Sequence, residues 1–324
     1  MKRRAIFSAA LAAAIAATAG SASAEPPPLK QKDRYKVGFA QMESNNPWRI
    51  AETKSFKDSA ESCNWDLIAT DAAGSAAKQV ADVDSMIAQG IDVLFLPPRE
   101  EKPLIPAVKK AKAAGIPTFL VDRSVDENAA KAGEDYISFL GSDFVDQGRR
   151  VADWVIENFE GDKGVIVELE GTTGSSPAND RKSGFDDRIA EDDRFEIVAS
   201  QSGDFARDQG RQVMETLLQA NPDVNIVYAH NDEMAIGAIQ ALELAGRKPG
   251  KDVMIVSIDG TRDALQAISD GKMGVTVESS PFFGPLACEV MERYASGEKI
   301  EPWVQVKDRV FTVENAADNI ADAY

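Results

Sequence analysis

Val-Tyr-Ala-His-Asn-Asp-Glu-Met-Ala-Ile-Gly, at Val227–Gly237, is the stretch that decides the fold class of this chain. An apolar run over 225–229 ends abruptly at polar side chains, and Ala235, Ile236 and Ala238 then recur at helical spacing. The pattern predicts a strand whose carboxyl end leads directly into the amino end of a helix. In open α/β sheets such junctions line the crevice where ligands bind, because unpaired N–H groups of the helix face it.

Strand and helix patterns alternate along the chain on both sides of this stretch. In the first part, strands are expected at 35–41, 65–69, 93–96 and 118–121, with helices at 47–63, 75–90 and 104–114. The pattern restarts near Tyr136, with strands expected at 136–140, 164–169, 195–200, 225–229, 253–257 and 273–277, and helices at 143–159, 178–191, 207–220, 232–245, 262–270 and 282–296. This alternation predicts α/β architecture with doubly wound parallel sheets. Two series of roughly a hundred residues or more predict two similar lobes.

The first residues predict an exported protein. The basic residues 2–4 precede a short apolar run over 5–19 and a small-residue site at 22–24, which is the pattern of a secretory signal cleaved after about Ala24. The apolar run is too short for a membrane anchor. The Pro-rich segment 25–34 is expected to be an extended or disordered arm.

Charge and cysteine content narrow the possible partners. The formal net charge is −17, so the surface repels phosphate backbones and nucleic acid is not an expected partner. The chain has two cysteines, Cys63 and Cys288. An oxidising compartment permits a disulfide between them without requiring one, and their spacing does not decide the question.

Polar and aromatic residues follow the expected strands and form a consistent set. Carboxylates accept hydrogen bonds, guanidinium groups donate them in a planar fork and amides do both, so together they can satisfy several hydroxyl groups. Aromatic rings add flat faces that suit the C–H face of a sugar. The candidates are Trp48, Arg49, Asp122, Arg123, Arg181, Phe205, Asn231, Asp259 and Glu278. The set predicts a cleft for a small polyhydroxylated molecule.

Taken singly, these residues have ordinary alternatives. Asn231 could serve only as a helix N-cap, and Asp122 with Arg123 could be a surface ion pair. Arg181 could be a solvated helix residue and Trp48 could be ordinary packing. The binding interpretation depends on their coincidence at strand carboxyl ends.

Catalytic and metal-binding patterns are weak. The one histidine, His230, would have to serve any Ser-His-Asp relay, and no Lys-Ser/Thr follows the loop 171–176 at P-loop spacing. Neither a Cys/His cluster nor an EF-hand pattern is present, so no metal and no cofactor is expected. A secreted glycosidase would need paired carboxylates, and Asp122, Asp259 and Glu278 are not excluded by residue type.

Five segments together resemble the periplasmic sugar-binding proteins of ABC transporters, in the group that includes ribose- and galactose-binding proteins. They are Asn46–Glu52, Val121–Ser124, Ser200–Phe205, Tyr228–Asp232 and Ser257–Gly260. The resemblance implies a monomeric, non-enzymatic periplasmic protein of the type I binding-protein fold. Its two lobes would close about a hinge on one monosaccharide, galactofuranose or a related hexose or pentose, and dock on a membrane permease. It implies a first lobe of 35–138 and 283–308 and a second lobe of 139–282 and 309–324.

The resemblance also implies roles for the candidates. Trp48 would stack on the sugar ring, Arg49 would donate to its hydroxyls, and Phe205 would close the other face. The remaining polar contacts would come from Asp122 and Arg123 in the first lobe, from Arg181, Asn231 and Asp259 in the second, and from Glu278 near the hinge.

Departures from the family pattern leave alternatives open. Pro97 stands where ribose binders carry an Asn, and Trp48-Arg49 replaces their paired Phe, which argues against ribose. Furanose and pyranose galactose both remain possible, and arabinose is a further alternative. A DNA-binding regulator is disfavoured because residues 1–34 hold no helix-turn-helix, whereas a sugar receptor for a chemotaxis or kinase sensor stays open.

Overall fold

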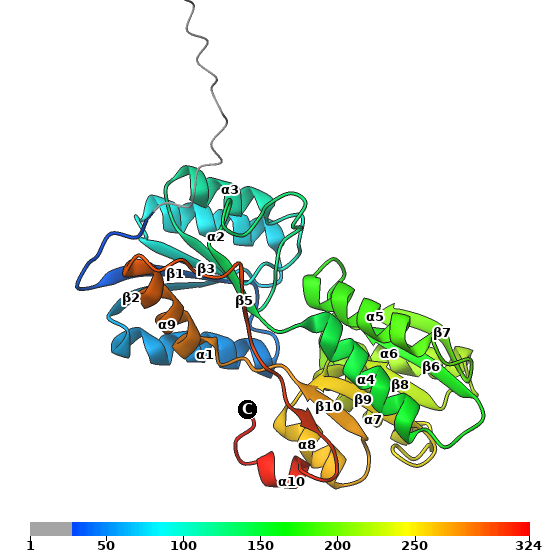
Figure 1. Cartoon of the computed structure of the whole chain (residues 1–324). Helices are drawn as coiled ribbons and strands as arrows, with labels where there is room; N and C mark the ends of the chain where they lie inside the picture. The colour runs from blue at the N-terminus through cyan, green and yellow to red at the C-terminus, as the bar shows by residue number, and fades with distance from the viewer. Residues whose placement is uncertain (1–27) are drawn as a thin grey trace, which may run out of the picture.

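The computed structural model describes residues 28–324, which form two α/β lobes joined by connecting segments (Figure 1). The predicted signal segment, its cleavage site and the start of the Pro-rich arm lie outside the described residues. Within 28–324 no helix is long and apolar enough to cross a membrane.

The first lobe is built on a six-stranded sheet in which all strands run parallel, in the order β11-β5-β4-β3-β1-β2. Its strands are β1 (Tyr35–Gln41), β2 (Trp65–Asp71), β3 (Val93–Leu96), β4 (Thr118–Val121), β5 (Ser138–Gly141) and β11 (Trp303–Gln305). Its helices are α1 (Pro47–Ser62), α2 (Ala76–Ala88), α3 (Ile105–Ala113) and α9 (Phe283–Ala295). Helices α1 and α9 cover one face of the sheet, and α2 and α3 cover the other (Figure 1).

The second lobe has a sheet of the same size, in the order β12-β10-β9-β8-β6-β7. Its strands are β6 (Gly164–Glu170), β7 (Phe195–Ser202), β8 (Ile226–Ala229), β9 (Met254–Asp259), β10 (Val275–Glu278) and β12 (Val310–Phe311), of which only β12 is antiparallel to its neighbour. Its helices are α4 (Phe144–Asn158), α5 (Ser176–Ile189), α6 (Arg207–Ala220), α7 (Asp232–Leu244), α8 (Arg262–Ser269) and α10 (Ala316–Asn319). The predicted fold class of two doubly wound lobes is confirmed.

The central strands owe their place to uninterrupted apolar sequence. All four residues of β3 are buried, and so are all four residues of β8. Such runs need helices on both faces of the sheet, which is the condition that a doubly wound lobe provides. At the end of β8 the chain turns into α7, and Asn231 caps that helix by accepting a hydrogen bond from the backbone N–H of Met234.

One predicted strand belongs to the other lobe. The strand expected at 136–140 was assigned to the start of the second lobe, but as β5 it pairs with β4 and lies in the first sheet. The chain therefore enters the second lobe after Gly141 rather than after residue 138. The sequence pattern identifies a strand without identifying its neighbours, so it does not show which sheet a strand at a crossover joins. The short elements β11, β12 and α10 were not predicted.

Part of the predicted arm is tied to the first lobe. Leu29 is buried in the core beside α1 and α9. Lys32 pairs with Asp92, and Arg34 donates to the backbone oxygen of Trp65. The described residues of the arm thus have no regular secondary structure but are held by contacts, so of the two expected alternatives, extended or disordered, the second does not apply to 28–34.

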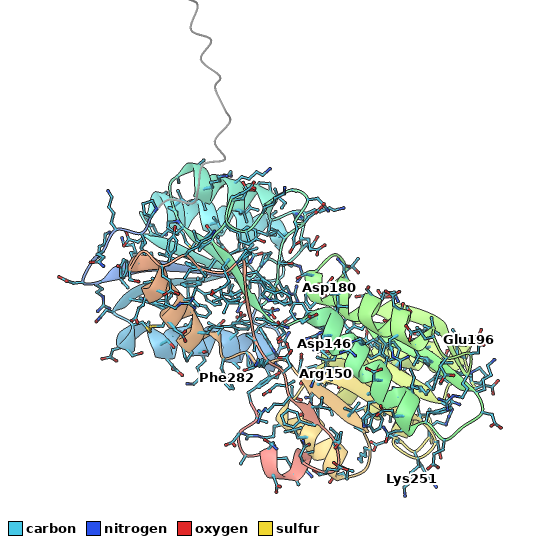
Figure 2. All side chains as sticks on the ribbon, in the orientation of Figure 1. Asp146, Arg150, Asp180, Glu196, Lys251 and Phe282 are labelled. Atoms are coloured by element: carbon cyan, nitrogen blue, oxygen red, sulfur yellow. A yellow bond between two sulfur atoms is a disulfide. The ribbon has the colours of Figure 1, made fainter. Side chains whose placement is uncertain are left out.

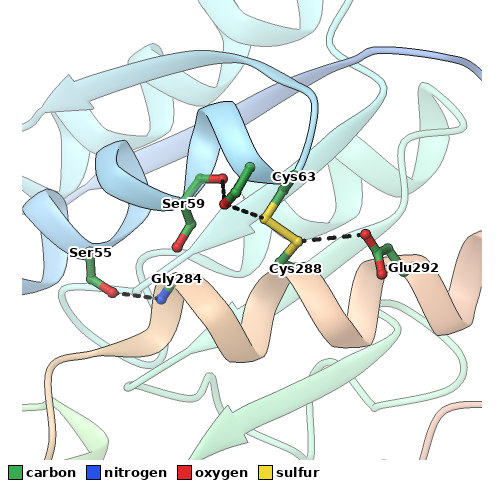
Figure 3. Close-up of a disulfide and its surroundings, with 7 residues drawn as sticks. Ser55, Ser59, Cys63, Gly284, Cys288 and Glu292 are labelled. Carbon is green, nitrogen blue, oxygen red and sulfur yellow. Dashed lines mark hydrogen bonds between the residues drawn. A yellow bond between two sulfur atoms is a disulfide. The ribbon is translucent and has the colours of Figure 1, made fainter.

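The chain crosses between the lobes three times, over 141–144, 278–283 and 305–310. Phe282, which is labelled in Figure 2, lies in the second of these crossings. The second crossing brings α9 back onto α1, where Cys63 and Cys288 form a disulfide (Figure 3). Nearby, the Gly284 N–H donates to the Ser55 hydroxyl at 2.9 Å. The disulfide therefore ties the returning segment to the first lobe and leaves the second lobe free of covalent cross-links among the described residues.

Candidate ligand-binding site

A cavity between the two lobes gathers eight of the nine predicted site residues. Its lining consists of Asn46, Trp48, Arg49, Asp122, Arg123, Pro177, Arg181, Phe205, Asn231, Asp259 and Ser279. The free space is small, about 30 Å³, whereas small-molecule sites commonly measure about 300–1,000 Å³. The lobes therefore have to separate to admit a ligand.

Arg49 anchors the first-lobe side of the cavity. Its guanidinium forms an ion pair with Asp122, and its Nη1 donates to Glu52 Oε2 at 2.9 Å. Gln41 Nε2 also donates to that Glu52 oxygen at 2.9 Å. Burial opposes the charge on Arg49, but Asp122 and Glu52 outweigh this effect and raise its pKa. Burial raises the pKa of Glu52 to about 7. The arrangement fixes Arg49 as a charged donor at the cavity wall.

Several residues at the cavity adopt backbone conformations that non-glycine residues rarely adopt. Asp122 has φ 58°, Phe205 has φ 56° and Asp259 has φ 136°. Asp204, next to Phe205, has φ 52°. Each such residue costs on the order of 1–3 kcal/mol and persists only where its surroundings impose it. These turns at the strand ends aim the two carboxylates and the phenyl ring into the cavity.

Arg123 carries an unsatisfied donor. Its Nη1 donates to the backbone oxygen of Arg99 at 2.8 Å, and its guanidinium lies 5.4 Å from the ring centroid of Phe205 across the cavity. Its Nε is buried without a hydrogen-bond partner among the described residues. Burial, and secondarily the positive charge of Arg49, lower the pKa of Arg123 to about 9. An acceptor oxygen on a ligand would satisfy this group and favour its charged form.

Arg181 is the corresponding cation of the second lobe. Its Nε donates to Gln147 Oε1 at 2.9 Å, its Nη1 to the backbone oxygen of His230 at 2.6 Å, and its Nη2 lies 3.4 Å from Asp259 Oδ1. Burial raises the pKa of Asp259 well above its usual range, and Arg181 opposes that rise. The helix that carries Arg181 is set by close packing, because a Cβ on Gly148 of α4 would lie 2.3 Å from the Arg181 backbone oxygen.

Asn231 has two functions at once. Its Oδ1 caps α7, and its Nδ2 donates to the backbone oxygen of Phe205 at 3.2 Å. A carboxamide has two N–H groups and two lone pairs, so one of each remains for a ligand in the cavity that Asn231 lines. The cap and the cavity interpretations therefore do not exclude each other.

The two neighbours of Asn231 are structural. His230 is fully buried, with Nε2 2.8 Å from Glu168 Oε1 and Nδ1 accepting from the Gly171 N–H at 3.3 Å. Asp232 is buried too, and it accepts hydrogen bonds from the Thr261 N–H and the Thr276 hydroxyl, each at 2.7 Å. Neither side chain lines the cavity.

Glu278 is the predicted site residue that the structure does not bring to the cavity. Its carboxylate forms a bidentate pair with Arg309, at 2.8 Å from Nε and 2.6 Å from Nη2. The next residue, Ser279, lines the cavity instead, and its backbone oxygen accepts a hydrogen bond from Trp48 Nε1 at 2.8 Å. Side chains alternate along a strand, so a one-residue error in position selects the wrong side chain.

Three lining residues were not among the predicted site residues. Asn46 lies in the segment Asn46–Glu52 that carries the family resemblance, and Pro177 directly follows the loop 171–176, so their position in the sequence was the available signal. Nothing in the sequence marks Ser279, since its backbone oxygen contributes the contact to Trp48.

The lining as a whole can hold a small molecule with several hydroxyl groups. It combines three guanidinium donors, two carboxylate acceptors and two aromatic side chains from both lobes. No group of His, Cys, Asp or Glu within the described part of the chain could hold a metal ion.

Comparison with known proteins supports a single family. A model described as periplasmic binding protein domain matches residues 37–299. The galactofuranose-binding protein YtfQ of Escherichia coli (strain K12) is 38% identical over 288 residues, which cover 88% of this chain and 90% of that protein. The ribose import binding protein RbsB of Bacillus subtilis (strain 168) is 34% identical over 279 residues, covering 86% and 87%. A Mycobacterium smegmatis crystal structure in complex with β-D-fucofuranose matches with a TM-score of 0.85 and 39% identity, covering 89% and 94%.

Proposed function

This chain belongs to the periplasmic binding protein family, and we propose that it captures a monosaccharide outside the cytoplasm and delivers it to an ABC permease. The observation that carries the proposal is the cavity, where side chains from both lobes that can hydrogen-bond to hydroxyl groups or stack on a sugar ring come together. Binding a sugar there would stabilise the closed arrangement, since the ligand can contact both walls only when the lobes are together.

The proposed ligand is galactofuranose or a related neutral hexose or pentose. Two of the similar proteins carry the names of furanose sugars, galactofuranose and fucofuranose. In this chain Trp48 and Phe205 supply apolar faces, and the unsatisfied Nε of Arg123 calls for an acceptor oxygen. Ring oxygens and hydroxyl groups are such acceptors, and hydroxyl groups also donate to Asp122 and Asp259.

The proposed function involves no bond cleavage. Asp122 is paired with Arg49, and Asp259 faces Arg181 at 3.4 Å. In this arrangement the carboxylates serve as hydrogen-bond acceptors for hydroxyl groups, with each guanidinium donating beside them. We therefore expect the sugar to be recovered unchanged.

Isothermal calorimetry with galactofuranose, galactose, arabinose and ribose tests the proposal. We expect binding with the strongest affinity for a furanose form, and chromatography of the incubated sugar should show no product. Arg181→Gln should weaken binding at least tenfold, because the loss of charge-assisted hydrogen bonds removes about 1.5–3 kcal/mol. Arg188→Gln is the matched control, since Arg188 lies on the same helix and pairs with Asp153 and Glu191 at the surface. The absence of heat with every sugar would refute the proposal.

A further inference from the structure

Arg99 connects the two lobes at a point outside the sugar cavity. It lies in the loop 97–101 that follows β3 in the first lobe, and its Nη2 is 3.5 Å from Asp204 Oδ2 in the second lobe. Arg99 does not line the sugar cavity, whereas Phe205, which follows Asp204, does. The contact joins the lobes directly beside a cavity wall.

The first-lobe end of this contact is firmly held. Arg99 Nη1 donates to Glu43 Oε2 at 2.7 Å, and Glu43 is only 3% exposed. The other oxygen of Glu43 has no hydrogen-bond partner among the described residues, and Arg99 is the ion-pair partner of this buried carboxylate. The Arg99 backbone N–H donates to Gln79 Oε1 at 3.0 Å. Gln79 is itself buried, and its Nε2 donates to the backbone oxygens of Ala40 and Pro97.

The second-lobe partner in this ion pair, Asp204, is more exposed to solvent than Arg99. The side chain of Asp204 is 35% exposed, whereas that of Arg99 is 13% exposed. Both residues line an open cavity of about 460 Å³. Two residues of that open cavity, Asn45 and Asp204, each precede a residue of the sugar cavity, Asn46 and Phe205. The ion pair therefore stands beside the sugar cavity, where opening of the lobes would break it.

Arg99 also touches the sugar-binding machinery. Its backbone oxygen accepts the 2.8 Å hydrogen bond from Arg123 Nη1, which orients the guanidinium that faces Phe205. The same loop reaches the second lobe again, since the Glu101 N–H donates to the Gly174 oxygen at 3.0 Å. One loop thus holds Arg123 in place and makes contacts that exist only when the lobes are together.

We propose that Arg99 is a positioning residue with two roles. Its ion pair with Asp204 acts as a latch, which stabilises the closed arrangement of the lobes, and its backbone oxygen orients Arg123 for the ligand. This inference rests on the proposed sugar-binding function and adds the contact that sets how long the closed state lasts. Because the latch forms after the lobes meet, it acts on sugar release more than on sugar capture. Arg99 itself touches no sugar.

Stopped-flow measurement of sugar binding to Asp204→Asn tests the latch. Asn tolerates the φ of 52° at this position, so the substitution removes charge without a new backbone penalty. We expect the dissociation rate and the Kd to rise about two- to fivefold, the range of a partly exposed ion pair, with little change in the association rate. Raising the salt from about 0.05 to 0.5 M should speed release from the wild type and not from the variant.

A double-mutant cycle separates the latch from general loss of stability. Arg99→Gln also removes the ion-pair partner of the buried Glu43, so the melting temperature of this variant is measured alongside. Once Asp204 is Asn, the further change at Arg99 should add less to the dissociation rate than it does alone. Arg99→Lys keeps the positive charge, so it should release sugar more slowly than Arg99→Gln and faster than the wild type. Arg149→Gln is the control, because Arg149 pairs with Asp146 and Asp153 within α4, and it should leave release unchanged.

Failure of the latch and failure of the proposed function give different results. If the wild type binds sugar and Asp204→Asn releases it at the wild-type rate, the latch is refuted and the function stands. If the wild type binds no sugar, small-angle scattering of the unliganded proteins decides. A more open average shape for Asp204→Asn than for the wild type then supports the latch, and identical profiles overturn it.

Discussion

Replacing Asp122 by Asn should weaken sugar binding without unfolding the first lobe. The substitution keeps the size of the side chain and removes its charge. A hydrogen bond to a charged group contributes about 1.5–3 kcal/mol, against about 0.5–1.5 kcal/mol for a neutral one. The difference of about 1–1.5 kcal/mol corresponds to a Kd raised by roughly 5- to 15-fold.

The backbone at this position makes Asn the informative choice. Asp122 has φ 58°, a conformation that Asn adopts readily and Ala does not. Asp122→Ala would therefore combine lost binding with backbone strain, whereas Asp122→Asn isolates the charge. A larger drop in melting temperature for Ala than for Asn would verify this separation.

The effect on stability should be modest because Arg49 has a second partner. The Arg49–Glu52 pair, at 2.9 Å, stays in place in the variant. The negative charge of Asp122 contributes to the raised pKa of Glu52, so its removal lets Glu52 ionise more readily and neutralise Arg49. We expect a loss of unfolding free energy of about 1–2 kcal/mol.

Calorimetry with galactofuranose and thermal unfolding without sugar measure the two effects. Asp66→Asn, an exposed carboxylate on β2, is the control and should change neither quantity. An Asp122→Asn protein that binds sugar with the wild-type Kd would show that this carboxylate does not contact the ligand. Our account of the first-lobe wall would then be wrong.

Three further outcomes follow from the structure. Glu278→Gln should keep the sugar Kd within about twofold in calorimetry, because exposed and peripheral pairs contribute about 0–1 kcal/mol; a tenfold loss would return Glu278 to the site. Replacing Cys63 and Cys288 by Ser should lower the unfolding free energy by about 2–5 kcal/mol in denaturant titration while sugar affinity persists, since the disulfide lies within one lobe; an unchanged midpoint would contradict this. Burial raises the pKa of Asp232 to about 6, so the folded state binds its proton more tightly than the unfolded chain, and stability should rise as the pH falls from about 7 to about 5 in thermal unfolding. The gain should reverse below about pH 4.5, because the unfolded chain then takes up a proton at Glu168, whereas the hydrogen bond with His230 holds the pKa of Glu168 at about 2 in the folded state; a melting temperature that falls steadily from pH 7 would refute the assignment.

Much of the fold was predictable because its signals are local. The helix starting at Pro47 and the strand Val93–Leu96 were predicted with the observed starts, since a proline suits the first turn of a helix and an unbroken apolar run suits a buried strand, and both signals act within a few residues. The family was predicted too, and the comparisons confirm it. The partner sheet of β5 was not predictable in this way, because strand pairing depends on contacts between residues distant in sequence.

Most residues that line the candidate cavity could be predicted as a set, but their interactions could not. Parallel sheets bring all strand carboxyl ends to one edge, so residues after strands meet there whatever their spacing in the sequence. Nothing in the sequence says that Arg49 pairs with Asp122 or that Arg181 bonds to the backbone of His230. Nor does it reveal the positive φ of Asp122, which decides where that carboxylate points.

The same distinction explains why Arg99 was missed. Sequence reasoning selects side chains that could touch a ligand, and Arg99 touches Glu43, Asp204 and, through its backbone oxygen, Arg123. Its partners come from two lobes, and Glu43 and Asp204 are more than a hundred residues apart in the sequence, so only the folded chain shows that they meet. In a protein whose ligand is held by closure, affinity depends on such contacts between lobes as well as on contacts with the sugar. Residues that tune release are therefore to be sought where lobes touch each other beside the ligand cavity.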